Sequence, residues 1–324
     1  NALDELSLIV LIENEITRNH GVKTMKEAIE YWRNVCRSKS LLKRWLERDS
    51  CSSTTAESIK VTHDMLSCAL PYEVMFSKML RTVSTKLEQL KLVNEKSKFG
   101  KTILHEATTK SCHLESMKLI LALLPEPERL KAVDMRNNNG WTALHYAAQS
   151  GNTDSLKTIL AVFPESERLK AVGLQNRDGN TVLHVAARSC NRESLEFILS
   201  LYPESERLHV VRMQNALGQT ALHLSRGLGC LNTILSLYPE SERLHGVRMQ
   251  DEFGWTPLHW AAQSGDLECI KLILSLYPET ERLQAVSMPD LLKWTTLHCA
   301  ARSGKTEAIK LILSLYHESE CLPV

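Results

Sequence analysis

The sequence lacks the short motifs by which most enzymes and cofactor-binding proteins are identified. It contains no GxxxxGKS/T phosphate loop, no GxSxG nucleophile turn, no HExxH zinc helix and no GxGxxG dinucleotide turn. Its nine cysteines form no CxxC pair, and their odd number favours reduced thiols over a disulfide framework. We therefore expect no catalytic residue, no cofactor and no metal site, and we expect that the protein is not an enzyme.

A strong charge imbalance and long apolar stretches are also missing. The chain has 39 basic and 38 acidic residues, and this near balance does not favour binding to nucleic acid or to a membrane surface. No apolar run reaches the roughly 18 residues that a membrane span needs. With 43% hydrophobic and 24% charged residues, the composition is that of an ordinary soluble protein.

A tetrapeptide of the form Thr-x-Leu-His recurs six times in the chain. The copies end at His105, His145, His184, His223, His259 and His298, at spacings of 40, 39, 39, 36 and 39 residues. A set of prolines follows the same period: Pro125, Pro164, Pro203, Pro239 and Pro278. Two independent markers with one period indicate an internal repeat of about 39 residues.

Each copy carries the signals of two short helices. The threonine is a good N-cap, because its hydroxyl can accept a backbone N–H of the first turn. A glycine such as Gly265 follows, and glycine suits the left-handed conformation that ends a helix. An apolar stripe such as Leu195, Ile198 and Leu199 then predicts a second helix. A turn-forming segment, for example Arg177-Asp178-Gly179, precedes each threonine.

The best-preserved copy, residues 251–265 with the sequence DEFGWTPLHWAAQSG, resembles the ankyrin-repeat signature almost position for position. The resemblance extends over about residues 97 to 316. It implies an all-α solenoid of stacked helix pairs, in which the turns and the first helices line a concave binding face. We therefore expect a helical N-terminal domain at residues 1–95, followed by six ankyrin repeats at residues 96–324.

The repeats are about six residues longer than the usual ankyrin repeat of about 33 residues. The extra residues form a regular insert, such as Pro203-Glu204-Ser205-Glu206-Arg207-Leu208, with a valine three residues further on. The proline ends the preceding helix, and the leucine and valine share one helical face. We predict a short third helix over residues 203–211, 239–247 and 278–286, with the leucine and valine of each buried.

This long unit is similar to the ankyrin effectors that intracellular bacterial pathogens inject through type IV secretion systems. The resemblance implies a host protein as the partner and the host cytoplasm as the location. The alternative is a protein that stays in the cytoplasm of its own cell, which the reduced cysteines also fit.

Two of the six repeats depart from the pattern. The fourth has lost three residues between His223 and Cys230, so its first helix should be about one turn shorter than the others. In the sixth, Lys293 stands where the others have glycine, and the insert is degenerate at residues 317–321. Terminal repeats are commonly atypical, because one of their faces has no neighbour.

Residues 3–95 contain no copy of the tetrapeptide. Their apolar pattern predicts four helices, at about 4–18, 24–48, 54–69 and 72–94. The first two residues, Asn1 and Ala2, are interpreted as the remainder of a removed tag.

Two further hypotheses concern this N-terminal region. Residues 70–93 resemble an F-box core, whose helices would dock on a ubiquitin-ligase adaptor; the competing interpretation is a degenerate capping repeat, because residues 65–71 resemble residues 120–125. An enzymatic activity would need a cysteine beside a histidine. The candidates are Cys36, Cys51, Cys68, His20 and His63.

The periodic histidines could suggest a row of metal ligands. Stacked helices lie about 8–10 Å apart, however, whereas zinc ligands lie about 2 Å from a common ion. The ankyrin resemblance implies instead that each ring bonds neighbouring backbone. The cysteines of the repeats, Cys190, Cys230, Cys269 and Cys299, are expected to be small buried apolar residues.

Aromatic residues gather in the turns and first helices of the fifth and sixth repeats. Exposed aromatic side chains are typical of binding hot spots, whereas partial burial against the next turn is the alternative. We expect a monomer that binds a protein partner, with no nucleic acid bound and no membrane span. The predicted contact residues are Trp141, Gln149, Arg188, Phe253, Trp255, Trp260, Gln263, Leu292, Trp294 and Arg302.

Overall fold

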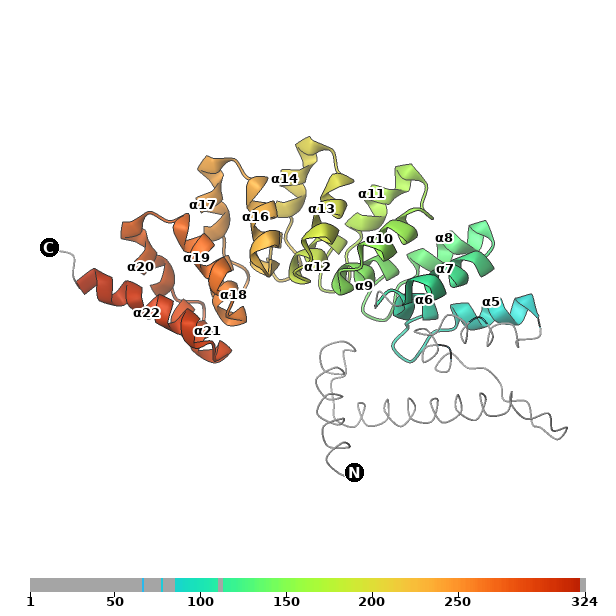
Figure 1. The fold of residues 1–324 in the computed structure, drawn as a ribbon, viewed down its shortest axis with the longest axis horizontal. Helices are drawn as coiled ribbons and strands as arrows, with labels where there is room; N and C mark the ends of the chain where they lie inside the picture. Colours follow the sequence, from blue (N-terminus) through green and yellow to red (C-terminus); the bar gives the residue numbers. More distant parts are fainter. Residues whose placement is uncertain (1–65, 67–76, 78–84, 110–112, 321–324) are drawn as a thin grey trace, which may run out of the picture. The chain divides into compact units, whose positions relative to one another are not determined.

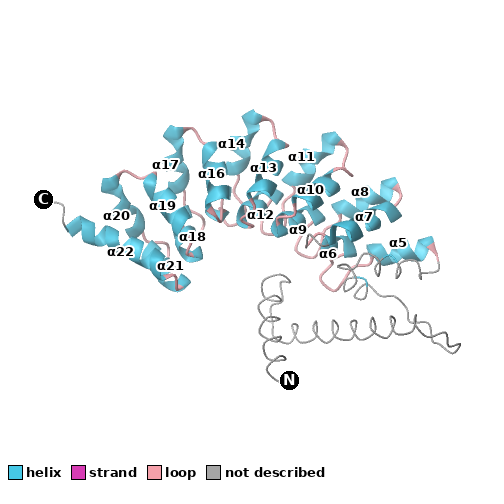
Figure 2. Ribbon diagram, in the orientation of Figure 1, coloured by secondary structure: helices cyan, strands magenta, loops and turns pink. Residues whose placement is uncertain are grey.

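The structure is a computed structural model that describes residues 66, 77, 85–109 and 113–320. These residues form helices joined by loops and contain no strand, which confirms the predicted all-α class (Figure 2). Apart from residues 66, 77 and 85–93, the four N-terminal helices, the F-box-like stretch and the Cys–His candidates lie outside the described residues.

The chain forms two compact bodies. The first consists of residues 1–107 with 112–132, and the second of residues 108–111 with 133–324. The first body contains helix α5, Lys86–Asn94, and most of repeat one, residues 97–136, with α6 at Ile103–Ala107, α7 at Leu114–Leu123 and α8 at Glu126–Asp134. The second body contains repeats two to six, which carry the candidate site.

Repeats two to five occupy residues 137–175, 176–214, 215–250 and 251–289, and each has three helices. Their first helices are α9, Ala143–Ser150; α12, Val182–Arg188; α15, Ala221–Leu224; and α18, Pro257–Ser264. Their second helices are α10, Thr153–Leu160; α13, Arg192–Ser200; α16, Leu228–Ser236; and α19, Leu267–Ser275. Their third helices are α11, Glu165–Gly173; α14, Glu204–Arg212; α17, Glu240–Arg248; and α20, Glu279–Ser287.

Within the second body, first and third helices lie along opposite edges. Figure 1 shows α9, α12 and α18 along one edge and α11, α14, α17 and α20 along the other. The first helices pack on one another from repeat to repeat, because the paired alanines, such as Ala186 and Ala187, allow close approach and are fully buried. The apolar stripe of the second helices, for example Leu156 and Ile159, is also fully buried.

The third helices confirm the prediction for the inserts in part. All four start directly after a proline, and their valines, such as Val211 and Val247, are fully buried. The prediction that the leucines are buried is wrong, since Leu208 is only half-buried. The helix instead turns two consecutive residues toward the stack, so that Val210 is buried beside Val211.

Repeat six, residues 290–320, has two helices: α21, Thr296–Ser303, and α22, Thr306–Glu320. His317 occupies the position at which the earlier repeats have a proline. Without that proline the backbone N–H groups stay available, and α22 continues without a break into the degenerate insert as far as Glu320.

The histidine of the tetrapeptide bonds its own turn on one side and backbone at or just before the following turn on the other. In repeat two the His145 Nδ1 accepts the Thr142 N–H, at 3.3 Å, and its Nε2–H donates to the Asn180 carbonyl, at 3.1 Å. His184, His223 and His259 donate to the carbonyls of Met213, Met249 and Met288, which directly follow the third helix of the same repeat, at 3.0 to 3.1 Å. The structural role implied for these rings is confirmed.

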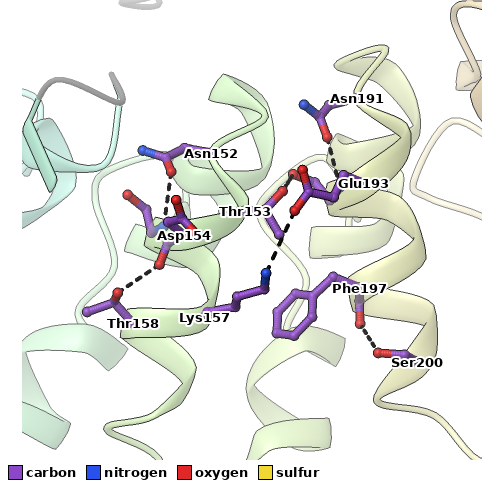
Figure 3. A network of polar contacts seen from close by, with 11 residues as sticks. Asn152, Thr153, Asp154, Lys157, Thr158, Asn191, Glu193, Phe197 and Ser200 are labelled. Carbon is purple, nitrogen blue, oxygen red and sulfur yellow. Dashed lines mark hydrogen bonds and ion pairs between the residues drawn. The ribbon is translucent and has the colours of Figure 1, made fainter.

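Polar contacts join the second helices on a different face from the turns. Asn152 and Asn191 start α10 and α13, and their Oδ1 atoms accept the N–H groups of Ser155 and Ser194. Figure 3 shows that Lys157 reaches across to Glu193, with Nζ and Oε1 3.7 Å apart. The charged side chains on this face of the second helices thus form ion pairs with one another.

Repeat four has the shortened first helix that the missing residues predict. Helix α15 has four residues, whereas α18 has eight. The shortened segment bonds both neighbouring repeats: the Arg226 N–H donates to the Ala187 carbonyl at 3.1 Å, and the Gly227 N–H donates to the Asp266 Oδ2 at 2.9 Å. Gly227 has a φ of 79°, and a side chain there would overlap the Cys190 Sγ.

Candidate functional site

The turn that opens each repeat of the second body is built around one buried side chain. Its Oδ1 accepts the N–H groups of the residues two and four positions further on, at 2.7 to 2.9 Å. The five residues are Asn137, Asn176, Asn215, Asp251 and Asp290. These two hydrogen bonds recur in every turn and fix its backbone conformation. The second and third turn residues lie on the outside of that backbone.

Consecutive turns are linked by backbone hydrogen bonds. The residue at the second position of a turn donates its N–H to the carbonyl at the third position of the turn before, at 2.9 to 3.1 Å. The third positions therefore follow one another in a continuous row, which we call the tip row. Its members are Asn139, Asp178, Leu217, Phe253 and Leu292. The tip row is polar in repeats two and three and apolar in repeats four to six.

The apolar end of the tip row is open to solvent. The exposed fractions are 37% for Leu217, 49% for Phe253, 73% for Leu291, 77% for Leu292 and 37% for Trp294. We call these five residues the apolar patch. Exposed apolar groups of this size on neighbouring turns usually mark a site of interaction. Of the residues predicted from sequence, Phe253, Leu292 and Trp294 belong to it.

Trp255 also links repeat five to repeat six, and Trp260 braces the turn of its own repeat. Both are half-buried, with ring centroids 5.0 Å apart. The Trp255 indole N–H donates to Asp290 of the next repeat at 2.7 Å, and the Trp260 indole N–H donates to Asp251 at 2.9 Å. Only the remaining surface of these two rings is open to a partner.

Asp290 is the acceptor on which the last turn depends. Its burial would raise the carboxyl pKa, but hydrogen bonds from the Trp294 N–H, the Trp255 indole and the Leu292 N–H outweigh burial and lower that pKa. The carboxylate is therefore charged at neutral pH and fully occupied by donors.

The end of the first helix of repeat six lies beside the apolar patch. Arg302 lies over the Trp294 ring, with 5.9 Å between its guanidinium carbon and the ring centroid. Gln149 and Arg188, at the same position in repeats two and three, are exposed, and Gln263 is half-buried. Trp141 is half-buried in repeat two, 5.1 Å from the Tyr146 ring, next to polar tips.

Leu217 and Arg226 are absent from the set predicted from sequence. Leu217 occupies the third turn position, and that register could have found it. Arg226 lies in the segment between His223 and Cys230 that has lost three residues. If the first helix of repeat four is taken to end early, at Leu224, Arg226 becomes a charged residue just after a first-helix end.

Residues 85–109 and 113–320 contain no group of three metal-ligating side chains that could hold an ion.

Burial raises the pKa of the Cys230 and Cys299 thiols to about 11 and about 12, so both behave as apolar residues. Cys190 is exposed, which corrects the expectation that it is buried. Cys190 occupies the position at which repeat two has Gly151, the residue that ends the first helix, and it has a φ of 63°.

The helices of the described residues include none long and apolar enough to cross a membrane.

Comparison with known proteins identifies the repeat. No curated protein sequence matches the chain. The family model "Ankyrin repeats (3 copies)" matches residues 74–168, 120–210 and 229–321. The first match includes most of the F-box-like stretch and so favours its interpretation as a degenerate repeat. The residues left between the second and third matches, 211–228, contain the shortened helix α15. Since the matches cover well over half of the sequence, the chain belongs to the ankyrin-repeat family.

Proposed function

We propose that this protein binds another protein through the apolar patch and the neighbouring first-helix ends of repeats five and six. Ankyrin repeats are protein-interaction modules, and the observation that carries the proposal is the exposure of Phe253, Leu291, Leu292 and Trp294 on adjoining turns. The second and third turn positions, which hold Phe253, Leu291 and Leu292 in the C-terminal turns, hold polar residues in repeats two and three without any change in backbone bonding. The apolar side chains are therefore not needed to form the turns.

The remaining predicted contacts surround this centre. Trp255 and Trp260 offer the faces of their rings that the repeats leave open. Gln263 and Arg302 form a polar rim at the first-helix ends, and Gln149 and Arg188 continue it. Trp141 extends the surface to repeat two. Rim residues contribute less binding free energy than central anchors, because solvent still reaches them.

The setting of this interaction is the second part of the proposal. The similarity of the 39-residue repeat and its insert to injected ankyrin effectors supports a role as an effector. In this role a monomer, with a helical domain at residues 1–95 and six repeats at residues 96–324, is delivered by type IV secretion into the host cytoplasm. The partner is then a host protein. The F-box and enzyme alternatives fall on the N-terminal region, where no observation favours them.

An affinity experiment tests the binding surface. Host-cell extract is passed over the immobilised wild type, over the Leu291→Ser/Leu292→Ser variant, and over the Asn138→Ser/Asn139→Ser variant, which changes the same two turn positions in repeat two. We expect a protein that the wild type and the repeat-two variant retain and the repeat-six variant loses. Retention of the same proteins by all three would contradict the proposed surface.

A translocation assay tests the effector role. The full chain is fused to a reporter that is active only in host cytoplasm, and delivery is compared between bacteria with and without a working type IV system. Signal that depends on the secretion system supports the effector role. An equal signal from both strains, or no signal from either, opposes it without affecting the binding surface.

A further inference from the structure

The arginines of the second body divide into two sets by their contacts. Residues 133–320 contain twelve arginines. Eight of them donate to a carbonyl or pair with a carboxylate: Arg136, Arg168, Arg192, Arg207, Arg212, Arg243, Arg248 and Arg282. The other four, Arg177, Arg188, Arg226 and Arg302, are exposed and form no hydrogen bond from the guanidinium and no ion pair within the described residues.

The four unpaired arginines share one side of the repeats. Arg177 belongs to the turn of repeat three, next to the tip residue Asp178. Arg188 and Arg302 are at or near the ends of the first helices α12 and α21, and Arg226 directly follows the shortened α15 region. The paired arginines instead lie mainly on the second and third helices. Within residues 133–320, the arginines whose guanidinium forms no hydrogen bond and no ion pair are thus confined to the side that carries the apolar patch.

The missing residues of repeat four bring two of these charges together. The Arg226 N–H donates to the carbonyl of Ala187, the residue before Arg188, at 3.1 Å. Arg226 therefore lies next to Arg188. Although the Arg188 side chain is partly exposed, desolvation by its neighbours and the charge of Arg226 lower the pKa of its guanidinium, and Asp178 opposes this effect. Two like charges close together repel each other, and an anionic group placed over both would relieve that repulsion.

The basic residues continue into the apolar patch. Arg302 lies over the ring of Trp294, so the last of the four arginines touches the patch directly. Lys293 is exposed in the same turn. Of the nearby acids, Asp251 and Asp290 are buried and occupied by N–H donors. Asp266, which follows the end of α18, is half-buried and accepts the N–H groups of Gly227 and Cys269, whereas Asp178 and Glu252 remain exposed on the turns.

We infer that the partner segment is an acidic peptide with apolar anchors. Its leucine- or phenylalanine-sized side chains cover Phe253, Leu291 and Leu292, and its carboxylates accept hydrogen bonds from Arg188 and Arg226. This inference rests on the proposed function and adds the chemistry of the partner. Guanidinium groups bind carboxylates through paired N–H donors, which gives direction as well as attraction.

The spacing of the repeats sets the length of the peptide. Packed helices lie about 8–10 Å apart, so repeats three and six are separated by about 30 Å. An extended chain rises about 3.3 Å per residue, so about nine residues connect the two ends. A polyanion such as nucleic acid fits less well, because the apolar patch offers it no contact and the net charge of the chain is only +1.

Peptide display tests the inference without a known partner. A random library of 12-residue peptides is selected on the full chain, and fluorescence anisotropy measures the affinity of the enriched peptides. The charge variant is Arg188→Gln/Arg226→Gln. The matched control is Arg192→Gln/Lys271→Gln, which removes two positive charges from exposed ion pairs on the second helices. The patch variant is Phe253→Ser/Leu292→Ser.

We expect enriched peptides with several Asp or Glu residues beside Leu or Phe, bound at least tenfold more weakly by the charge variant than by the control. Exchanging Glu for Lys in the peptide should abolish binding, and added salt should weaken it. Neutral or basic peptides that bind the wild type and are lost only by the patch variant would overturn the inference and leave the proposed function standing. Enriched peptides that depend on neither surface, or no enrichment, would overturn both.

Discussion

The turns of repeats two and three and those of repeats five and six share one backbone arrangement but differ in the residues at their tips. Both pairs open with a buried Asn or Asp that accepts two backbone N–H groups, and both join the next turn through one backbone bond. The tips are Asn139 and Asp178 in the first pair and Phe253 and Leu292 in the second. The turn residues therefore have two separate roles. The first residue fixes the turn backbone through its side-chain hydrogen bonds, and the side chain of the third residue is available to contact a partner.

Substitution of the buried first turn residue should have the largest effect on the free energy of unfolding. Asp290→Ala leaves the N–H groups of Leu292 and Trp294 and the Trp255 indole without their acceptor, and Asn176→Ala does the same to two N–H groups in repeat three. Each substitution should lower the free energy of unfolding by about 2–4 kcal/mol. Chemical denaturation followed by circular dichroism measures it. A loss below about 0.5 kcal/mol in both variants would show that these residues do not hold the turns.

The histidines make the scaffold sensitive to acid. Burial lowers the pKa of His145 to about 4, and burial also lowers the pKa of His184, His223 and His259. An unfolded histidine has a pKa near 6.5, so below that pH the unfolded chain binds more protons than the folded one. Stability should therefore be full above pH 6.5 and fall as the pH drops toward 4.

The slope of this loss is about 1.4 kcal/mol per pH unit for each such histidine. Denaturation midpoints at pH 7.5, 6.5, 5.5 and 4.5 measure it, and His145→Gln should make the slope shallower. A stability that stays constant between pH 6.5 and 4.5 would refute the neutral, hydrogen-bonded state of these rings.

Trp255 and Trp294 occupy equivalent turn positions in repeats five and six but should contribute differently to stability. Trp255 is hydrogen-bonded to the next repeat, whereas the hydrogen bond and ring contacts of Trp294 are with Asp290, His298 and Arg302 of its own repeat. Trp255→Ala should cost about 2 kcal/mol of unfolding free energy, because a half-buried ring and a bond to a buried carboxylate are lost. Trp294→Ala should cost less than about 1 kcal/mol. Equal losses in urea denaturation would contradict this division.

The outcome for these residues shows what sequence could predict. The helices of the inserts follow from proline and from apolar spacing, and both are local. The half-burial of Leu208 does not follow, because a leucine and a valine three positions apart can share a face that is only partly turned toward the stack. The difference between Trp255 and Trp294 does not follow either. It depends on Asp290, 35 residues after Trp255, reaching back to its indole.

The most direct test of the separation between scaffold and recognition is the free energy of unfolding of the variant Phe253→Asn/Leu292→Asp. This variant gives the C-terminal turns the polar tips of repeats two and three. We predict an unfolding free energy within about 0.5 kcal/mol of the wild type, as for exposed positions elsewhere, together with loss of peptide binding. A variant destabilised by about 2 kcal/mol or more would contradict the account, because the apolar tips would then be part of the core.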